Sequence, residues 1–195
     1  MTSQQSALEW VEREDAECRV ERVERLEWLM QLYPPTQMVV FPGGLLTKLL
    51  FEEARYAFIH ALFAGATLLS LAFIERCLAA LFYGAGRNDL ERASLQTLST
   101  EAFNLGNLDA ADLSELEALR SIRNPLTHFR SYDSEDRIEV RAVRSMLGRD
   151  DEGYLPEEIV ANDAVRAMKV AMHILGKFCT PDSLGSFRGQ PIRSG

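Results

Sequence analysis

The chain has 195 residues, and 47% of them are apolar, so it is long enough to bury the core of one domain and too apolar to be generally disordered. Its net charge of −8 counts against nonspecific electrostatic binding to nucleic acid, because such binding depends on lysine and arginine side chains. The cysteines are widely spaced and form no Cys-x-x-Cys pair, which argues for a reducing compartment and against a zinc knuckle or a disulfide framework: Cys18, Cys77 and Cys179. The first fifteen residues carry neither the basic region nor the apolar stretch of a secretory signal, and we therefore expect a cytoplasmic protein.

A first helix is predicted over residues 6–33 and is ended by Pro34 and Pro35. Apolar residues at spacings near 3.6 are expected to supply much of its core face: Leu8, Val11, Val20, Val23, Leu26, Leu29 and Met30. Residues 36–44 form a connector. We assign residues 1–44 to this N-terminal helix and its connector.

The stretch 45–83 is rich in alanine and leucine and almost free of helix breakers. It predicts a helical hairpin or a single long helix, with Gly65 as the expected break. Residues 57–74 are apolar enough to raise the alternative of a membrane span. The charged residues that flank them, and the absence of a basic bias on either side, favour a buried core helix instead.

Further helices are predicted over residues 89–103, from Ala110 onward, and from Asn162 or Asp163 to Phe178. Asp109 or Asp112 is the expected N-cap of the second of these. Residues 137–146 alternate like an edge strand but also permit a helix, which we favour. The expected fold is all-α, a bundle of about five to six helices, with a helical domain over 45–180 and a flexible tail over 181–195.

The helix that begins near Ala110 carries the segment RSIRNPLTHFR, residues 120–130. This is the one segment of the sequence whose residues have the composition expected of a catalytic site. On a helical wheel a polar arc of roughly 140° opposes an apolar face made by Leu119, Ile122, Leu126 and Phe129. The polar arc contains Arg120, Arg123, Asn124, Thr127, His128 and Ser131. A fixed cation, an amide and an imidazole are the groups needed to hold a phosphate and move a proton beside it.

A simpler interpretation is that this polar arc is only the solvated side of an amphipathic helix. Two features favour a site. Residues 120–149 contain seven arginines and form the only locally basic stretch, and His128 is the only histidine with arginines beside it. His60 is expected to be a core residue and His173 to lie at a packing boundary between helices.

The order of these pieces resembles the HEPN superfamily of small all-helical domains. A long helical stretch contains FIERCLAALFYGAG, a connecting helix follows, and then comes LEALRSIRNPLTHF. The family motif is an arginine, four to six residues and a histidine, commonly with Asn, Asp or His after the arginine. Arg123, Asn124 and His128 match it at the shortest spacing.

The resemblance implies an up-and-down helical core, here with an extra N-terminal helix, and a homodimer in which two motif helices meet across a two-fold axis. In active members it implies RNA cleavage without a metal or other cofactor. His128 and Arg123 would then be catalytic, with Asn124 orienting one of them. Arg120, Thr127 and Arg130 are candidate substrate contacts, and Glu75 matches the acidic position that would fix Arg123 or His128.

The sequence is compatible with two main functions. Arg130 stands two residues after His128, where members with a nucleotidyltransferase antitoxin carry tyrosine, so regulation through that tyrosine is not supported. The first hypothesis is a dimeric ribonuclease, such as a toxin or defence effector with a protein antitoxin. The second is a noncatalytic helical module for dimerisation and for nucleotide or protein binding. DNA binding lacks a helix-turn-helix signature, and neither a membrane nor a metal is expected.

Overall fold

The computed structural model describes residues 3–32, 38–147 and 155–189 and is helical without a strand in these ranges, which confirms the predicted all-α bundle. The longer helices are α1 (Ser3–Leu32), α2 (Leu45–Ile59), α3 (Phe63–Gly84), α4 (Leu95–Asn104), α5 (Ala110–Thr127), α6 (Ile138–Leu147) and α7 (Pro156–Phe178). Two short turns complete it, η1 (Asn88–Leu90) and α8 (Pro181–Leu184). The favoured helix over 137–146 is therefore confirmed as α6. Pro34 and Pro35 and residues 148–154 lie outside the described ranges.

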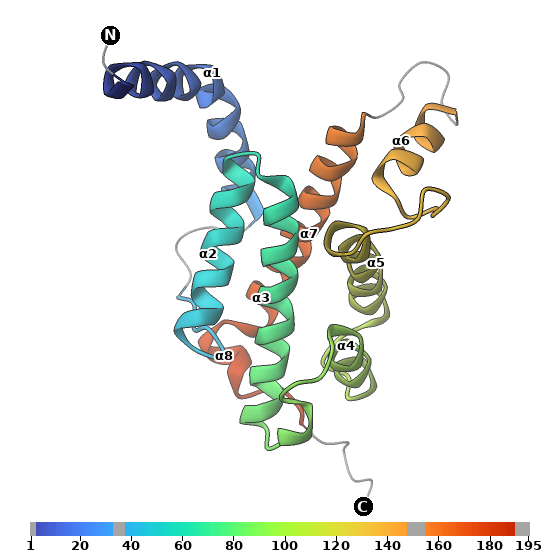
Figure 1. Ribbon diagram of the computed structural model, residues 1–195. Helices are drawn as coiled ribbons and strands as arrows, with labels where there is room; N and C mark the ends of the chain where they lie inside the picture. The colour runs from blue at the N-terminus through green and yellow to red at the C-terminus, as the bar shows by residue number, and fades with distance from the viewer. Residues whose placement is uncertain (1–2, 33–37, 148–154, 190–195) are drawn as a thin grey trace, which may run out of the picture.

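Helix α3 forms the centre of the bundle. Figure 1 shows α2 beside it, with α7 behind the pair and α4 and α5 stacked on the other side. The side chains of Phe73, Ile74, Leu78 and Phe82 are fully buried. By length and composition α3 could cross a membrane, with a mean hydropathy of 1.6, but a core helix meets the same criteria. The expected core role is consistent with its packing against α2, α5 and α7.

The break between α2 and α3 lies at residues 60–62, so the hairpin is confirmed but the prediction of Gly65 as its break is wrong. Ala61 adopts a left-handed conformation, with φ of 57°. The Leu62 amide donates to the Ala57 carbonyl at 2.8 Å, and the Ala61 amide donates to the Phe58 carbonyl at 3.1 Å. This is the Schellman geometry that usually places glycine where Ala61 stands. The Phe58 and Phe63 rings meet across the turn, 6.0 Å apart, and fix its position.

Helix α1 packs on the bundle only through its C-terminal end. Leu29 is buried, and the Trp28 ring lies 5.1 Å from the Phe58 ring. The Arg25 Nε donates to the Ile59 carbonyl at 2.8 Å. Figure 1 shows the rest of α1 projecting away from α2. The prediction of its core face is wrong except at Leu29, because these residues are exposed: Leu8, Val11, Val20, Val23, Leu26 and Met30.

Two other predicted helix starts are also wrong. Helix α4 begins at Leu95, later than expected, because Ser94 caps it by accepting from the Thr97 amide. Helix α7 begins with Pro156 in its first turn, so Asn162 and Asp163 lie inside it and cap nothing. Asp163 is instead buried and accepts two hydrogen bonds of 2.7 Å from Arg141, which holds α6 against α7.

The first part of the predicted tail packs on the core. The Phe187 ring lies edge-on to Phe82 at 5.0 Å and to Phe178 at 5.6 Å. The Asn107 side chain exchanges two hydrogen bonds, of 2.7 and 2.9 Å, with the main chain of Arg188. Residues 181–189 thereby close the end of the bundle where α3, α4 and α7 meet, and residues 190–195 lie outside the described range.

Candidate functional site

Helix α5 carries the motif and is fixed at both ends. Asp109 caps it by accepting from the Asp112 amide at 2.9 Å, and the Asp112 carboxylate accepts in return from the Asp109 amide. Of the two predicted caps, Asp109 is therefore correct. Leu116, Leu119 and Ile122 are buried, so the apolar face packs inward as predicted along most of the helix.

The helix ends at Thr127, whereas the helical wheel assumed that it continued as far as Ser131. Pro125 has no N–H and cannot donate to the carbonyl one turn before it. The Thr127 hydroxyl donates to the Arg123 carbonyl at 3.1 Å, and the His128 amide donates to the Asn124 carbonyl at 3.0 Å. His128 then takes an extended backbone, with φ −128° and ψ 139°. The prediction that Phe129 packs inward on this helix is wrong, since 85% of its side chain is exposed.

Arg123 and Glu75 are brought together from different helices. The Arg123 Nη1 donates to the Glu75 Oε2 at 3.2 Å, which ties α5 to α3. Both side chains stay partly exposed, at 47% for Arg123 and 33% for Glu75. Both line a groove of about 350 Å³, which also contains two arginines without an ion-pair partner among the described residues, Arg76 and Arg92.

His128 is exposed at the end of α5 and does not line that groove. Its side chain makes no hydrogen bond to another described residue. Asn124 is half-buried, and Arg120 is exposed on the outer side of α5. Arg130 forms an ion pair with Asp136 at 3.2 Å. Among the predicted site residues, Arg123 and Glu75 are thus the pair joined through their side chains, and the groove that they line contains none of Arg120, Asn124, Thr127, His128 and Arg130.

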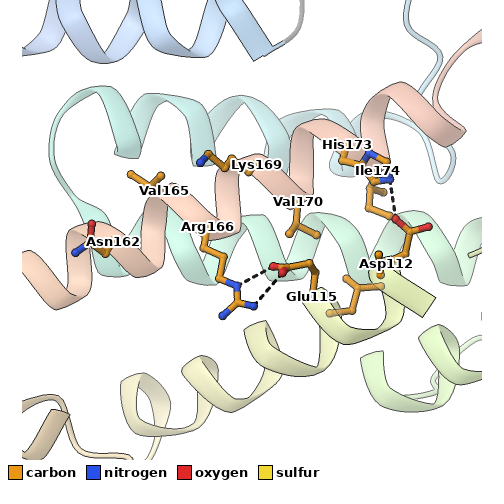
Figure 2. Close-up of a pocket in the computed structure, with 11 residues that line it drawn as sticks. Asp112, Glu115, Asn162, Val165, Arg166, Lys169, Val170, His173 and Ile174 are labelled. Atoms are coloured by element: carbon orange, nitrogen blue, oxygen red, sulfur yellow. Dashed lines mark hydrogen bonds and ion pairs between the residues drawn. The ribbon is translucent and has the colours of Figure 1, made fainter. Parts of the chain in front are cut away.

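A second groove, of about 550 Å³, lies between α5 and α7 (Figure 2). Arg166 reaches across it from α7 and donates two hydrogen bonds, of 2.7 and 3.0 Å, to Glu115 of α5. At another point of the groove, the Asp112 carboxylate lies 2.7 Å from the His173 Nε2 and accepts a hydrogen bond from Lys177. Each of these pairs joins the two helices, so this groove is bridged by structural ion pairs.

Our sequence interpretation did not anticipate the Asp112, His173 and Lys177 cluster. His173 and Lys177 are one turn apart on α7 and therefore point the same way, which is the signal that the sequence contained. Their partner was hidden because it lies 61 residues before His173. His60 also differs from expectation: it is half-buried at the end of α2, where its ring stacks on Tyr56 at 4.2 Å.

No family model matches this chain, and no curated protein or solved structure matches it.

Proposed function

We propose that this chain is a metal-independent endoribonuclease of the HEPN type that works as a homodimer, in the manner of a toxin or defence effector. The observation that carries the proposal is that Glu75 holds Arg123 little more than one helical turn before the exposed imidazole of His128. A positioned cation and an unpaired imidazole that are close in the chain are two of the groups that phosphodiester cleavage by general acid–base chemistry needs.

In this mechanism His128 takes the proton from a ribose 2′-hydroxyl, whose oxygen then attacks the adjacent phosphorus. The bond to the leaving 5′-oxygen breaks, and that oxygen takes a proton from a second imidazole. Arg123 holds the phosphate and stabilises the negative charge that develops on its oxygens. The Asn124 carbonyl accepts a hydrogen bond from the His128 amide, so Asn124 orients His128 relative to Arg123.

A dimer gives this chemistry its second imidazole. One chain contributes a single His128, and neither His60 nor His173 lines the groove that contains Arg123. Two motif helices facing each other would bring a second His128 to the same phosphate. Arg120, Thr127 and Arg130 then flank the path of the RNA.

The decisive experiment incubates the purified chain with RNA in EDTA and follows cleavage. His128→Ala and Arg123→Ala are each expected to reduce the rate by about 100-fold or more. His60→Gln and Arg144→Ala are matched controls, because His60 lies at the turn between α2 and α3, and Arg144 lies on α6 and pairs with Glu135 in the loop before it. The absence of cleavage, or cleavage that survives His128→Ala, would overturn the proposal.

The competing function is a noncatalytic module that dimerises and binds a nucleotide or a protein. It is favoured by one observation, that Glu75 already neutralises Arg123 and so competes with a phosphate for it. It predicts that Arg123→Ala abolishes ligand binding while no RNA product forms at any protein concentration.

A further inference from the structure

Helix α1 has an apolar side that no described part of the chain covers. Only its C-terminal end contacts the bundle, and four large apolar side chains before that end are 37–59% exposed: Leu8, Val11, Val23 and Leu26. On a wheel of about 100° per residue these four lie within an arc of about 120°. The opposite side of the helix carries exposed glutamates, namely Glu14, Glu17, Glu21 and Glu24. The helix therefore has one solvated side and one apolar side that lacks a partner.

Four charged residues lie on this same side of α1, between its two apolar pairs: Glu12, Asp15, Arg19 and Arg22. Together with Val23 and Leu26 they line a groove of about 540 Å³, which Ile59 at the end of α2 also lines. The Arg22 guanidinium donates to the Asp15 carboxylate at 2.8 Å. Glu12 and Arg19 have no ion-pair partner among the described residues. A single chain therefore leaves two of these four charges unpaired.

The apolar and charged residues of this side are arranged symmetrically about Glu17. They form four pairs whose members are equally distant from Glu17 along the chain: Leu8 and Leu26, Val11 and Val23, Glu12 and Arg22, and Asp15 and Arg19. When two copies of a helix lie antiparallel about a two-fold axis at one residue, positions equally distant from that residue lie at the same level. Each apolar residue of the set then lies opposite an apolar residue, and each acid lies opposite an arginine.

We propose that α1 is a dimerisation arm, whose apolar side pairs antiparallel with α1 of a second copy of this chain about a two-fold axis at Glu17. Glu12 then gains the partner's Arg22, and Arg19 gains the partner's Asp15. The glutamates on the opposite side stay in water. Because α1 lies outside the motif helix α5, this pairing is independent of the proposed nuclease.

The charge of α1 favours a second copy of the chain over other occupants. Residues 9–27 contain eight acidic residues and four arginines. A helix that lies on an anionic membrane carries lysine and arginine on its polar side, where α1 carries glutamates. Nucleic acid is repelled by the same glutamates. A second copy fits the surface along its whole length, because the pattern is complementary to itself in the antiparallel direction.

The native Cys18 can report the pairing, because it is one residue from the two-fold axis and lies outside the core. Packed helices have axes about 8–10 Å apart, so a bismaleimide of about 10 Å should link Cys18 to the partner's Cys18 in the unmodified chain. Cys77 and Cys179 are buried and should not react. A denaturing gel measures the yield of linked dimer, and dilution should abolish it by returning the arms to their single-chain state.

Charge reversal tests the register of the pair. Asp15→Arg places two arginines opposite each other at both symmetric contacts, and Arg19→Glu places two acids there. Each variant alone should lower the yield of linked dimer about tenfold or more, because directly opposed like charges repel. An equimolar mixture of the two variants should recover the yield, since the arginines of one chain then face the acids of the other.

Glu17→Arg is the matched control. It changes the charge of α1 by the same amount as Asp15→Arg but on the solvated side, so the yield should not fall. The absence of linked dimer in the unmodified chain would overturn the pairing. So would a mixture that links no better than its separate components, or an equal loss in Glu17→Arg, because association would then not depend on this register.

The proposed nuclease is tested by a separate measurement on the same chain. Linked dimer without any RNA cleavage would support the arm and reject the enzyme. Cleavage by a chain that gives no linked dimer at Cys18 would support the enzyme and reject the arm.

Discussion

Glu75 Oε2 on α3 and Arg123 Nη1 on α5 are 3.2 Å apart, although 48 residues separate them in the chain. A partly exposed ion pair contributes about 1 kcal/mol or less to stability. Its importance therefore lies in where it holds the arginine.

The first prediction concerns this pair. Glu75→Ala should lower the rate of RNA cleavage about tenfold, because a catalytic group displaced by even 1 Å loses much of its effect. The melting temperature should stay nearly unchanged. Glu52→Ala is the matched control, since Glu52 forms a similar exposed pair with Arg55 on α2. Cleavage that rises in Glu75→Ala would show that the glutamate only competes with the phosphate.

The second prediction concerns the buried carboxylate of Asp112, whose side chain is 7% exposed. Burial raises the pKa of Asp112, but hydrogen bonds from Lys177 and the Asp109 amide outweigh it, and the net pKa lies below the ordinary value. A depressed pKa in the folded state stabilises the fold above the unfolded pKa, and this contribution is lost as the pH falls below about 4.

Asp112→Asn should therefore reduce the free energy of unfolding by about 2 kcal/mol at pH 7, and the difference from the unmodified chain should shrink as the pH falls toward 2. Urea denaturation at several pH values measures it. Asp15→Asn removes an exposed pair with Arg22 and should leave stability nearly unchanged. A difference that grows in acid would contradict the assigned pKa direction.

The third prediction concerns thiol reactivity. Cys77 and Cys179 are fully buried with their sulfurs 3.7 Å apart, and Cys18 is half-exposed on α1. The hydrogen bond with Cys179 and burial raise the pKa of the Cys77 thiol well above its ordinary value, which suppresses the reactive thiolate. Iodoacetamide at pH 8 should add one group to the folded chain and three in guanidinium chloride, as read by intact mass. Rapid addition of three groups to the folded chain would contradict this burial.

The fourth prediction concerns Phe187, which packs edge-on against Phe82 and Phe178. Phe187→Ala should reduce the free energy of unfolding by about 2 kcal/mol, less than a fully buried ring would cost because Phe187 is half-buried. Phe129→Ala is the matched control, since that ring is exposed. Equal stability of the two variants would mean that residues 181–189 do not brace the core.

The helices of the bundle were largely predictable because apolar periodicity depends on local spacing alone. The position of the break in the α2–α3 hairpin was not. Gly65 has the better local preference for a break, but Phe58 and Phe63 pack against each other and place the turn at Ala61. Tertiary packing overrode a preference of about 1 kcal/mol.

The candidate site was predictable only in part. The spacing of Arg123 and His128 was visible in the sequence, and the contact of Arg123 with Glu75 is observed. The wheel failed after Thr127, because a wheel assumes a continuous helix and Pro125 weakens the last turn. The exposure of Phe129 follows from that ending and not from any property of phenylalanine.

The projecting part of α1 also has a thermal consequence. Residues 5–17 are exposed on every side, so their helix is supported by local hydrogen bonds and charge pairs and not by a core. Helix without packing frays gradually on heating, whereas the bundle from Leu29 onward unfolds as a unit. The loss of helical signal should therefore begin at temperatures where the tryptophan beside Phe58, Trp28, still reports a native core.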